Sequence, residues 1–296
     1  MSGGVSDRPT SRRGRAALPY LGVVPFLAFV FTFLLYPTVI VAVGAFQGDG
    51  GGFTWGNVQT AIEPGPYRDS LVRSLELSAS TAVLGAVLGA LVAYAVSTGN
   101  PDGVVRRTVT AFCGVLAQFG GVMLAFAFIA TVGFTGLVTV FLKDQFGIDI
   151  LAASVWPYEM SGLIVVYCYF QIPLMVLVFL PALDGVRPQW REAAESVGAT
   201  TWQYWRHVAG PLLLPAFLGS TLLLFANAFS SYATAAALIS QGRVILPLQI
   251  DGALTSEVVL GQANLAKALA LTMVVVVAVV MTLYAVLQRR TSRWLQ

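Results

Sequence analysis

The sequence predicts an all-α polytopic membrane protein with six transmembrane helices. Hydrophobic residues make up 57% of the 296 residues and charged residues only 10%, whereas about 25% of the residues in an ordinary soluble domain are charged. The mean hydropathy of +0.77 agrees with this assignment. A water-soluble core of this length could not bury so much apolar surface, and the longest apolar runs are long enough to span a bilayer.

Six apolar stretches are the predicted spans, separated by segments rich in glycine, proline and charge. Residues 1–16 are expected to be a disordered basic tail, residues 184–210 a polar loop, and residues 289–296 a second tail. In the second span, Gly85 and Gly89 form a small-xxx-small face that favours close helix packing. The predicted spans cover about 17–46, 71–97, 108–133, 161–183, 211–239 and 264–287.

The distribution of lysine and arginine orients these spans. With the N-terminus inside, the inner segments hold twelve of the 17 basic residues and the outer segments hold five. The inner residues are Arg8, Arg12, Arg13, Arg15, Arg106, Arg107, Arg187, Arg191, Arg206, Arg289, Arg290 and Arg293; the outer ones are Arg68, Arg73, Lys143, Arg243 and Lys267. The positive-inside rule therefore places both termini and the loop 184–210 in the cytoplasm, with the chain in the plasma or inner membrane.

Several kinds of chemistry are absent from the sequence. Neither lysine follows a glycine, so no phosphate-binding G-x-x-x-x-G-K-[ST] loop exists, and the H-E-x-x-H and G-x-S-x-G motifs are missing too. Two cysteines in apolar runs and a single histidine favour neither a disulfide framework nor a metal site. We expect no catalytic residues and no cofactor in this chain, so any ATP would have to bind a partner.

The polar stretch Arg191–Pro215 is predicted to form two short helices that lead into the fifth span. Its early carboxylates suit a helix N-terminus, Gly198 can end the first helix in the left-handed conformation, and Thr200 or Thr201 can cap the second. The residues assigned to this element are Glu192, Ala193, Ala194, Gly198, Trp202, Val208 and Pro211.

This stretch resembles the cytoplasmic loop of permease subunits from binding-protein-dependent ABC importers. That family has E-A-A, three residues, glycine, about nine residues, an aliphatic residue and a proline. The spacing is met here except that Gly210 replaces the leucine usual before the proline. The matching residues are Glu192, Ala193, Ala194, Gly198, Val208 and Pro211.

The resemblance covers roughly Leu18 to Arg290 and implies a type I, MetI-like permease fold. It implies two paired permease subunits, usually two different chains but in some cases two copies of one, and two ATPase subunits that bind ATP and Mg²⁺. An extracytoplasmic solute-binding protein would deliver the solute. The helix around Glu192 to Gly198 would sit in a groove of an ATPase and couple ATP use to transport.

The substrate class is indicated only weakly. Tyr36-Pro37 and the stretch 227–236 look similar to permeases of the spermidine and putrescine branch, which import small charged solutes. The polar signature of many sugar permeases is not evident at 134–142. Ferric iron, thiamine and phosphonate systems look alike at these positions.

Polar residues inside the spans are candidates for a translocation path, because lipid exposure of polar groups is costly. Asn227, Ser231 and Thr234 recur at helical spacing and would share one face of the fifth span. Hydrogen bonding between helices is an equal alternative for these residues, and Glu76 could instead pair with Arg73 at an interface. The candidate path residues are Asn227, Ser231, Thr234, Gln118, Gln171 and Glu76.

Two other functions compete with that of an importer permease. An ion-coupled secondary transporter usually carries buried carboxylates near the midplane and inverted repeats. Here Glu76 is the one carboxylate predicted within a span, it is near one end, and no repeat is evident. A membrane scaffold without transport would fit the composition but would leave the Glu192 loop unexplained.

Overall fold

A computed structural model describes residues 23–48, 50–100, 102–152, 155–239, 245–255 and 262–292. Within these ranges the secondary structure consists of helices and one isolated antiparallel β-bridge between Gln47 and Phe53. The elements are α2 (Val24–Val30), the π-helical η1 (Phe31–Leu35), α3 (Tyr36–Ala45), α4 (Gly56–Ile62), α5 (Pro66–Ser97), α6 (Val104–Gln118), α7 (Gly121–Val132), α8 (Leu137–Phe146), the 3₁₀ turn η2 (Trp156–Tyr158), α9 (Met160–Asp184), α10 (Pro188–Ser196), α11 (Thr201–Tyr204), the π-helical η3 (Trp205–Ala209), α12 (Gly210–Phe229), α13 (Ala233–Leu238), α14 (Leu246–Thr255) and α15 (Ala263–Ser292).

Six helical stretches are long and apolar enough to cross a membrane, which agrees with the predicted number. The tail expected at 1–16 and the start of the first span lie outside the described residues, as do residues 293–296 of the second tail. Helix α15 continues to Ser292, five residues beyond the predicted end of the sixth span. The six stretches are Val24–Ala45, Pro66–Ser97, Gly121–Phe146, Met160–Asp184, Thr201–Phe229 and Ala263–Val286.

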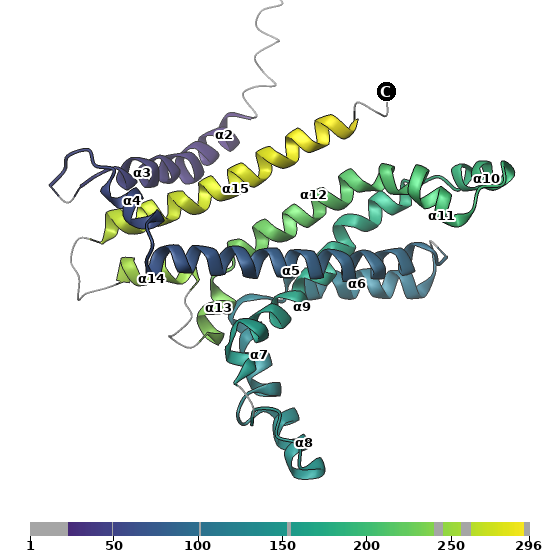
Figure 1. The fold of residues 1–296 in the computed structure, drawn as a ribbon, viewed down its shortest axis with the longest axis horizontal. Helices are drawn as coiled ribbons and strands as arrows, with labels where there is room; N and C mark the ends of the chain where they lie inside the picture. The colour runs from purple at the N-terminus through teal and green to yellow at the C-terminus, as the bar shows by residue number, and fades with distance from the viewer. Residues whose placement is uncertain are drawn as a thin grey trace, which may run out of the picture.

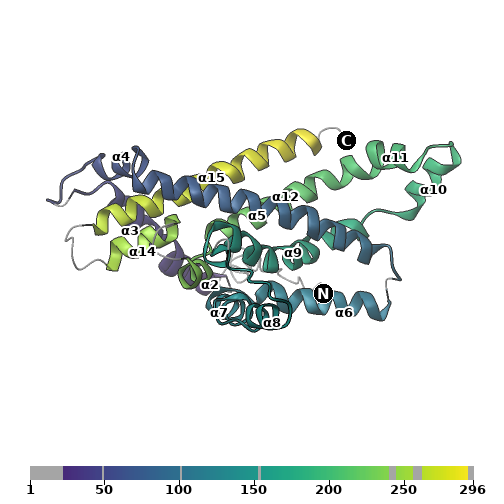
Figure 2. The same ribbon diagram turned by 60° about the horizontal axis from the view of Figure 1, so that its bottom comes forward.

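The centre of the molecule is a group of packed helices in which α9 lies against α5, α6 and α12 (Figures 1 and 2). Helix α9 is apolar on all sides, and such a helix is stable only when its whole surface is covered by protein or lipid. It is accordingly the most buried of the six stretches, and Tyr167, Met175 and Val176 have no exposed surface.

The predicted glycine face of α5 is the contact surface with α9. A Cβ atom on Gly85 would lie 2.8 Å from Cβ of Gln171, and one on Gly89 would lie 2.5 Å from Cβ of Met175. Because no side chain fits at either position, the two glycines set the distance between the central helices. The small-xxx-small pattern is therefore a packing device, as predicted.

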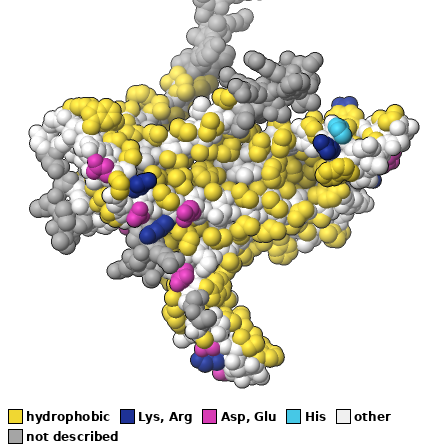
Figure 3. All heavy atoms as spheres, in the orientation of Figure 1, with side chains coloured by type: hydrophobic (Ala, Val, Ile, Leu, Met, Phe, Trp, Pro, Cys, Tyr) yellow, Lys and Arg dark blue, Asp and Glu magenta, His cyan; other side chains and the backbone are white. Residues whose placement is uncertain are grey.

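The first and last helices form an outer layer. Helix α3 lies along α15, and the helices before it carry large side chains that protein does not cover (Figure 1). Phe26 and Phe29 of α2 and Phe33 of η1 are each more than 60% exposed. Figure 3 shows that apolar side chains cover the middle of one face, while charged side chains gather toward its ends and on the projecting arm. This distribution suits a protein surrounded by lipid and by other membrane subunits.

The prediction of one continuous third span over 108–133 was wrong. Helix α6 ends at Gln118, and α7 begins at Gly121, whose φ of +69° suits a residue without a side chain. From this break α7 and α8 project out of the helix bundle as an arm (Figures 1 and 2). The Gly120–Gly121 pair provides the physical reason, because two adjacent glycines let the chain turn sharply.

The prediction of a helix over 211–239 was wrong at both ends. The helical stretch begins at Thr201, because the π turn η3 joins α11 to α12 without interruption, and it ends at Phe229. After the helix ends, Ser231 and Tyr232 lead into the separate helix α13. Ser230 donates its hydroxyl to the carbonyl of Ala226 at 2.9 Å, a bond with which serine competes with the regular helix.

Serine side chains on α5 hold α14 in place. Ser70, Ser74 and Ser78 are buried, and each hydroxyl donates to the carbonyl four residues earlier in the helix. Ser74 Oγ also accepts a 2.8 Å hydrogen bond from the backbone N–H of Leu246, the first residue of α14. The start of α14 is thereby satisfied by a side chain of another helix, as buried helix termini require.

Substituting Gly89 by alanine should lower the melting temperature of the purified protein by several degrees. The new Cβ would meet Met175 and the carbonyl of Ile172, and overpacking of this kind costs about 1–3 kcal/mol. Gly114→Ala is the matched control, because a Cβ at this other helical glycine meets nothing within 4 Å. Equal melting temperatures for Gly89→Ala and the unaltered protein would contradict the packing role.

Candidate functional site: an exposed hairpin and a cavity between two helix breaks

The polar loop forms a helical hairpin at one end of the molecule, made of α10 and α11 (Figure 1). Gly198 has φ of +77°, and its N–H donates to the carbonyl of Glu195 at 3.0 Å. The N–H of Ala199 donates to the carbonyl of Ala194, also at 3.0 Å. These two bonds are a Schellman motif, so Gly198 ends the first helix as predicted.

Thr200 is the cap of the second helix. Its Oγ1 accepts from the N–H of Gln203 at 3.3 Å, and the side chain of Gln203 accepts from the N–H of Thr200 at 2.7 Å. This reciprocal pair is a capping box. It satisfies two backbone donors at the start of α11, so the turn and the second helix are fixed by local bonds.

A π-helical turn joins the hairpin to α12, and it explains the glycine at position 210. The N–H of Gly210 donates to the carbonyl of Trp205, which closes the wide turn. A Cβ at position 210 would lie 2.5 Å from that carbonyl oxygen. The wide turn lies directly before Pro211, and such a turn accommodates a proline ring that would crowd a regular helix.

The free side of the hairpin presents apolar and charged side chains together. Trp202 is 71% exposed and Val197 is 82% exposed, so the rest of the chain covers neither side chain. Arg191 Nε donates to Glu195 at 2.9 Å, and this bond raises the pKa of the Arg191 guanidinium above its ordinary value.

The structure places the other predicted hairpin residues on this element too. Glu192 and Ala193 are exposed on α10 and Ala194 is half-buried. Val208 is half-buried in the π turn, and Pro211 is exposed at the start of α12.

The two helix breaks meet around a small cavity of about 130 Å³. The break between α6 and α7 contributes Gly120 and Gly121, and the end of α12 contributes Asn227 and Ser231. Broken helices inside a membrane protein expose backbone N–H and C=O groups, which are the groups that transporters use to hold solutes. The remaining lining residues are Ala117 and Phe170.

Side-chain hydrogen bonds connect the two helix breaks to neighbouring segments. Thr234 Oγ1 donates to the carbonyl of Gly121 at 3.3 Å. The hydroxyl of Tyr167, on the buried helix α9, donates to the carbonyl of Ser231 at 2.8 Å. Asn227, Ser231 and Thr234 therefore lie around the same site, although they do not share a helix face as predicted.

The other predicted path residues lie elsewhere. Gln118 is exposed at the end of α6 and is not part of the lining. Gln171 is fully buried and donates its amide to the carbonyl of Leu224 at 3.0 Å, which makes it an interhelical contact. Glu76 is exposed on α5, and in the part of the chain that the structure describes no ion pair joins it to Arg73.

Sequence reasoning missed the contributions of Gly120, Gly121 and Tyr167. The pair of glycines within an apolar run was a usable signal for a break. Tyr167 gave no such signal, because its role depends on a contact with a residue 64 positions away.

Residues 85–293 match the family of binding-protein-dependent transport system inner membrane components. The chain belongs to this family. It is 26% identical over 212 residues to a putative ferric transport system permease protein of Haemophilus influenzae, which is 70% of this chain but only 32% of that protein. It is also 26% identical over 119 residues to the molybdenum transport system permease protein ModB of Escherichia coli, 40% of this chain and 49% of that protein.

A solved structure has the same fold. It is a bacterial alginate ABC transporter in complex with an alginate pentasaccharide-bound periplasmic protein, and one of its chains matches with a TM-score of 0.73. The match covers 94% of this chain and 96% of that chain at 17% identity. The predicted type I importer permease fold is confirmed.

Substituting Gly210 by alanine should loosen the junction between the hairpin and α12. The added Cβ conflicts with the Trp205 carbonyl, so the hydrogen bond that closes the π turn must lengthen. Hydrogen exchange measured by mass spectrometry should show about tenfold faster exchange over 205–212, corresponding to about 1.4 kcal/mol. Gly252→Ala is the control, because this helical glycine has open space around it, and it should leave the exchange over 205–212 unchanged. Unchanged exchange in the Gly210→Ala variant would contradict the role of Gly210 in closing the π turn.

Proposed function

We propose that this chain is a transmembrane permease subunit of an ATP-driven ABC importer and that it forms part of the path for a small solute. The observation that carries the proposal is the exposed hairpin, which is shaped by local bonds and faces away from the bundle. Trp202 and Val197 are exposed on this polar element and are available for contact with a partner.

The hairpin lies in the cytoplasm in this proposal, together with both termini. The support is the excess of basic residues, twelve against five, in the segments assigned to the inner side. The C-terminal end of α15 lies on the same side as the hairpin (Figure 1). The loop between α5 and α6 also lies at that end, and Arg106 next to it pairs with Asp184 at the end of α9.

The partner at the hairpin is an ATPase subunit, and two copies would serve the two permease subunits. This chain has no phosphate-binding loop, so ATP and Mg²⁺ bind to that partner. Helix α10 would occupy a groove of the ATPase, with Glu192 to Gly198 at its centre. Closure of the ATPases would then favour one arrangement of the spans through differential contacts.

The cavity between the helix breaks is the proposed contact with the solute, and Asn227 and Ser231 are its polar side chains. A second permease subunit, either a different chain or a second copy, would complete the path. An extracytoplasmic binding protein would load it, as the periplasmic protein does in the alginate transporter complex.

We favour a small inorganic anion over a polyamine as the solute. The lining of the cavity consists of glycine, alanine, phenylalanine, asparagine and serine, and a polycation would require carboxylates. Backbone N–H groups at the start of α7 and the amide of Asn227 are donors suited to an anion. The name of the molybdenum relative favours an inorganic solute over the polyamine assignment made from Tyr36-Pro37 and the stretch 227–236, whereas the name of the ferric relative refers to a cation.

An ion-coupled secondary transporter is the alternative, and the geometry disfavours it. Such a transporter needs a carboxylate that titrates or binds a cation within the path. Glu76, the one carboxylate predicted in a span, is exposed on α5 and does not line the cavity. Uptake that persists in a strain without the partner ATPase would restore this alternative.

Glu192→Lys and Gly198→Asp should lower solute uptake at least tenfold while the chain is inserted in the membrane in normal amount. The first change reverses a charge on the surface that binds the ATPase. The second forces a side chain into a left-handed backbone conformation at the helical turn. Uptake, membrane abundance and ATPase co-purification should be measured together, with Asp102→Asn in the neighbouring loop as control. Normal uptake and normal ATPase assembly in both variants would refute the coupling role.

Asn227→Ala should reduce uptake about tenfold at saturating loaded binding protein, because a polar contact to the solute is lost in the path. The basal ATPase rate of the complex should stay unchanged. Thr221→Ala is the control: this residue is also on α12, but its hydroxyl bonds back to the carbonyl of Phe217. If both variants transported equally well, Asn227 would have only a packing role.

A further inference from the structure

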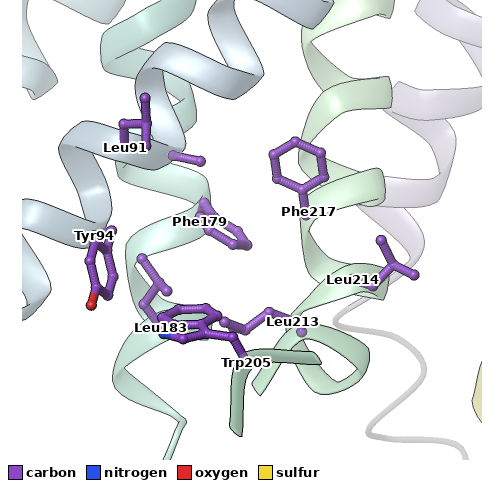
Figure 4. A pocket seen from close by; sticks show the side chains of 10 residues that line it. Leu91, Tyr94, Phe179, Leu183, Trp205, Leu213, Leu214 and Phe217 are labelled. Atoms are coloured by element: carbon purple, nitrogen blue, oxygen red, sulfur yellow. The ribbon is translucent and has the colours of Figure 1, made fainter. Parts of the chain in front are cut away.

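A large apolar cavity lies between α5, α9 and the start of α12, next to the base of the hairpin. Its volume is about 390 Å³, within the range of sites that hold a whole small ligand. Figure 4 shows Phe179 and Phe217 facing its interior, and the Trp205 ring between the two sides near Leu183. Leu91, 60% exposed, lies at its side on the candidate span Pro66–Ser97, so the cavity reaches the apolar surface of the helix bundle.

A second cavity of about 580 Å³ continues the first toward the hairpin end, and the two share Tyr94, Leu183, Trp205 and Leu213. This second cavity is lined by both apolar and charged side chains. Three arginines line it, Arg106, Arg187 and Arg191, together with one acidic residue, Asp184. The formal net charge of the lining is therefore three minus one, or +2.

The partners of these arginines show where a ligand could bind. Arg106 pairs with Asp184, and Arg191 pairs with Glu195. Arg187 makes no ion pair with any residue that the structure describes. A cationic group is therefore available at the mouth of a cavity whose interior is apolar.

We propose that the two cavities together bind one anionic phospholipid of the surrounding bilayer, with its acyl chain among Leu91, Phe179 and Phe217 and its phosphate at Arg187 and Arg191. Basic pockets between transmembrane helices are known to hold acidic lipid headgroups. A soluble anion would use only the second cavity, which holds the arginines, and a neutral apolar ligand would use only the first. A membrane lipid is the ligand class that matches an apolar cavity that reaches the surface of a membrane-spanning helix and is continuous with a cationic mouth.

The bound lipid would brace the base of the hairpin. Arg187 and Pro188 lie where α9 gives way to α10, and Trp205 packs edge-on against Tyr94 of α5 with ring centroids 5.3 Å apart. A lipid in contact with both segments holds the junction in one arrangement. The proposal concerns binding alone and does not depend on which solute the protein carries.

Quenching of Trp205 fluorescence by brominated lipids tests the proposal directly. The full chain, with its other five tryptophans changed to phenylalanine, is reconstituted in nanodiscs of phosphatidylcholine containing brominated phosphatidylglycerol or brominated phosphatidylcholine. At equal mole fraction the anionic lipid should quench at least fivefold more efficiently. Arg187→Gln with Arg191→Gln should abolish this preference, and Ala90→Phe, which fills the apolar cavity, should reduce quenching by both lipids.

Arg107→Gln is the matched control, because Arg107 is exposed next to Arg106 but does not line the cavity. It should keep the preference intact, and circular dichroism should confirm that every variant is folded. Equal quenching by the two lipids would overturn the proposal, as would an equal loss in Arg107→Gln. Full displacement of the lipid by soluble glycerol phosphate would also overturn it, since that result would indicate a site for free phosphate.

Discussion

The constraint on which this structure depends is that backbone polar groups inside a membrane must be satisfied by the protein itself. Most of the chain meets it by remaining helical. Two of the helix breaks in the described residues, after Gln118 and after Phe229, lie against each other, and side chains of Thr234 and Tyr167 donate to carbonyls at these breaks. These two irregular segments thus meet at one place, which contains the cavity lined by Asn227 and Ser231.

The same constraint acts at the hairpin junction in a different form. Pro211 cannot donate a hydrogen bond, and a regular helix would crowd its ring. The π turn before it shifts the bonding pattern by one residue, and Gly210 provides the space for the turn to close on the Trp205 carbonyl. Glycine at this position, instead of the leucine usual in the family motif, is thus a requirement of this local geometry.

Local signals in the sequence predicted what local bonds determine. The Schellman turn at Gly198 and the cap at Thr200 were predictable because each depends on residues within five positions. The glycine spacing on α5 was predictable because close packing needs missing side chains in one row.

The helix breaks were not predicted, because apolarity identifies a membrane segment without identifying its backbone conformation. The run 108–133 is predominantly apolar, yet Gly120 and Gly121 divide it. Helical spacing of Asn227, Ser231 and Thr234 predicted a shared helix face, but the chain leaves the helix after Phe229. Asn227 and Ser231 nevertheless line one cavity, and Thr234 bonds to Gly121 beside it. The role of Tyr167 depends on tertiary structure and has no local signature.

One continuous helical stretch connects the two parts of the candidate site. Thr201–Phe229 has 29 residues, and at 1.5 Å per residue it is about 43 Å long. Its first turn belongs to the hairpin, and its last residues lie at the cavity with Asn227.

Because a helix is stiff along its axis, a displacement of the hairpin must move the far end of this stretch, unless the π turn deforms instead. Two contacts oppose deformation of the π turn: the hydrogen bond from Gly210 N–H to the Trp205 carbonyl, and the packing of Trp205 against Tyr94. The junction therefore determines how much of any movement at the hairpin reaches the cavity.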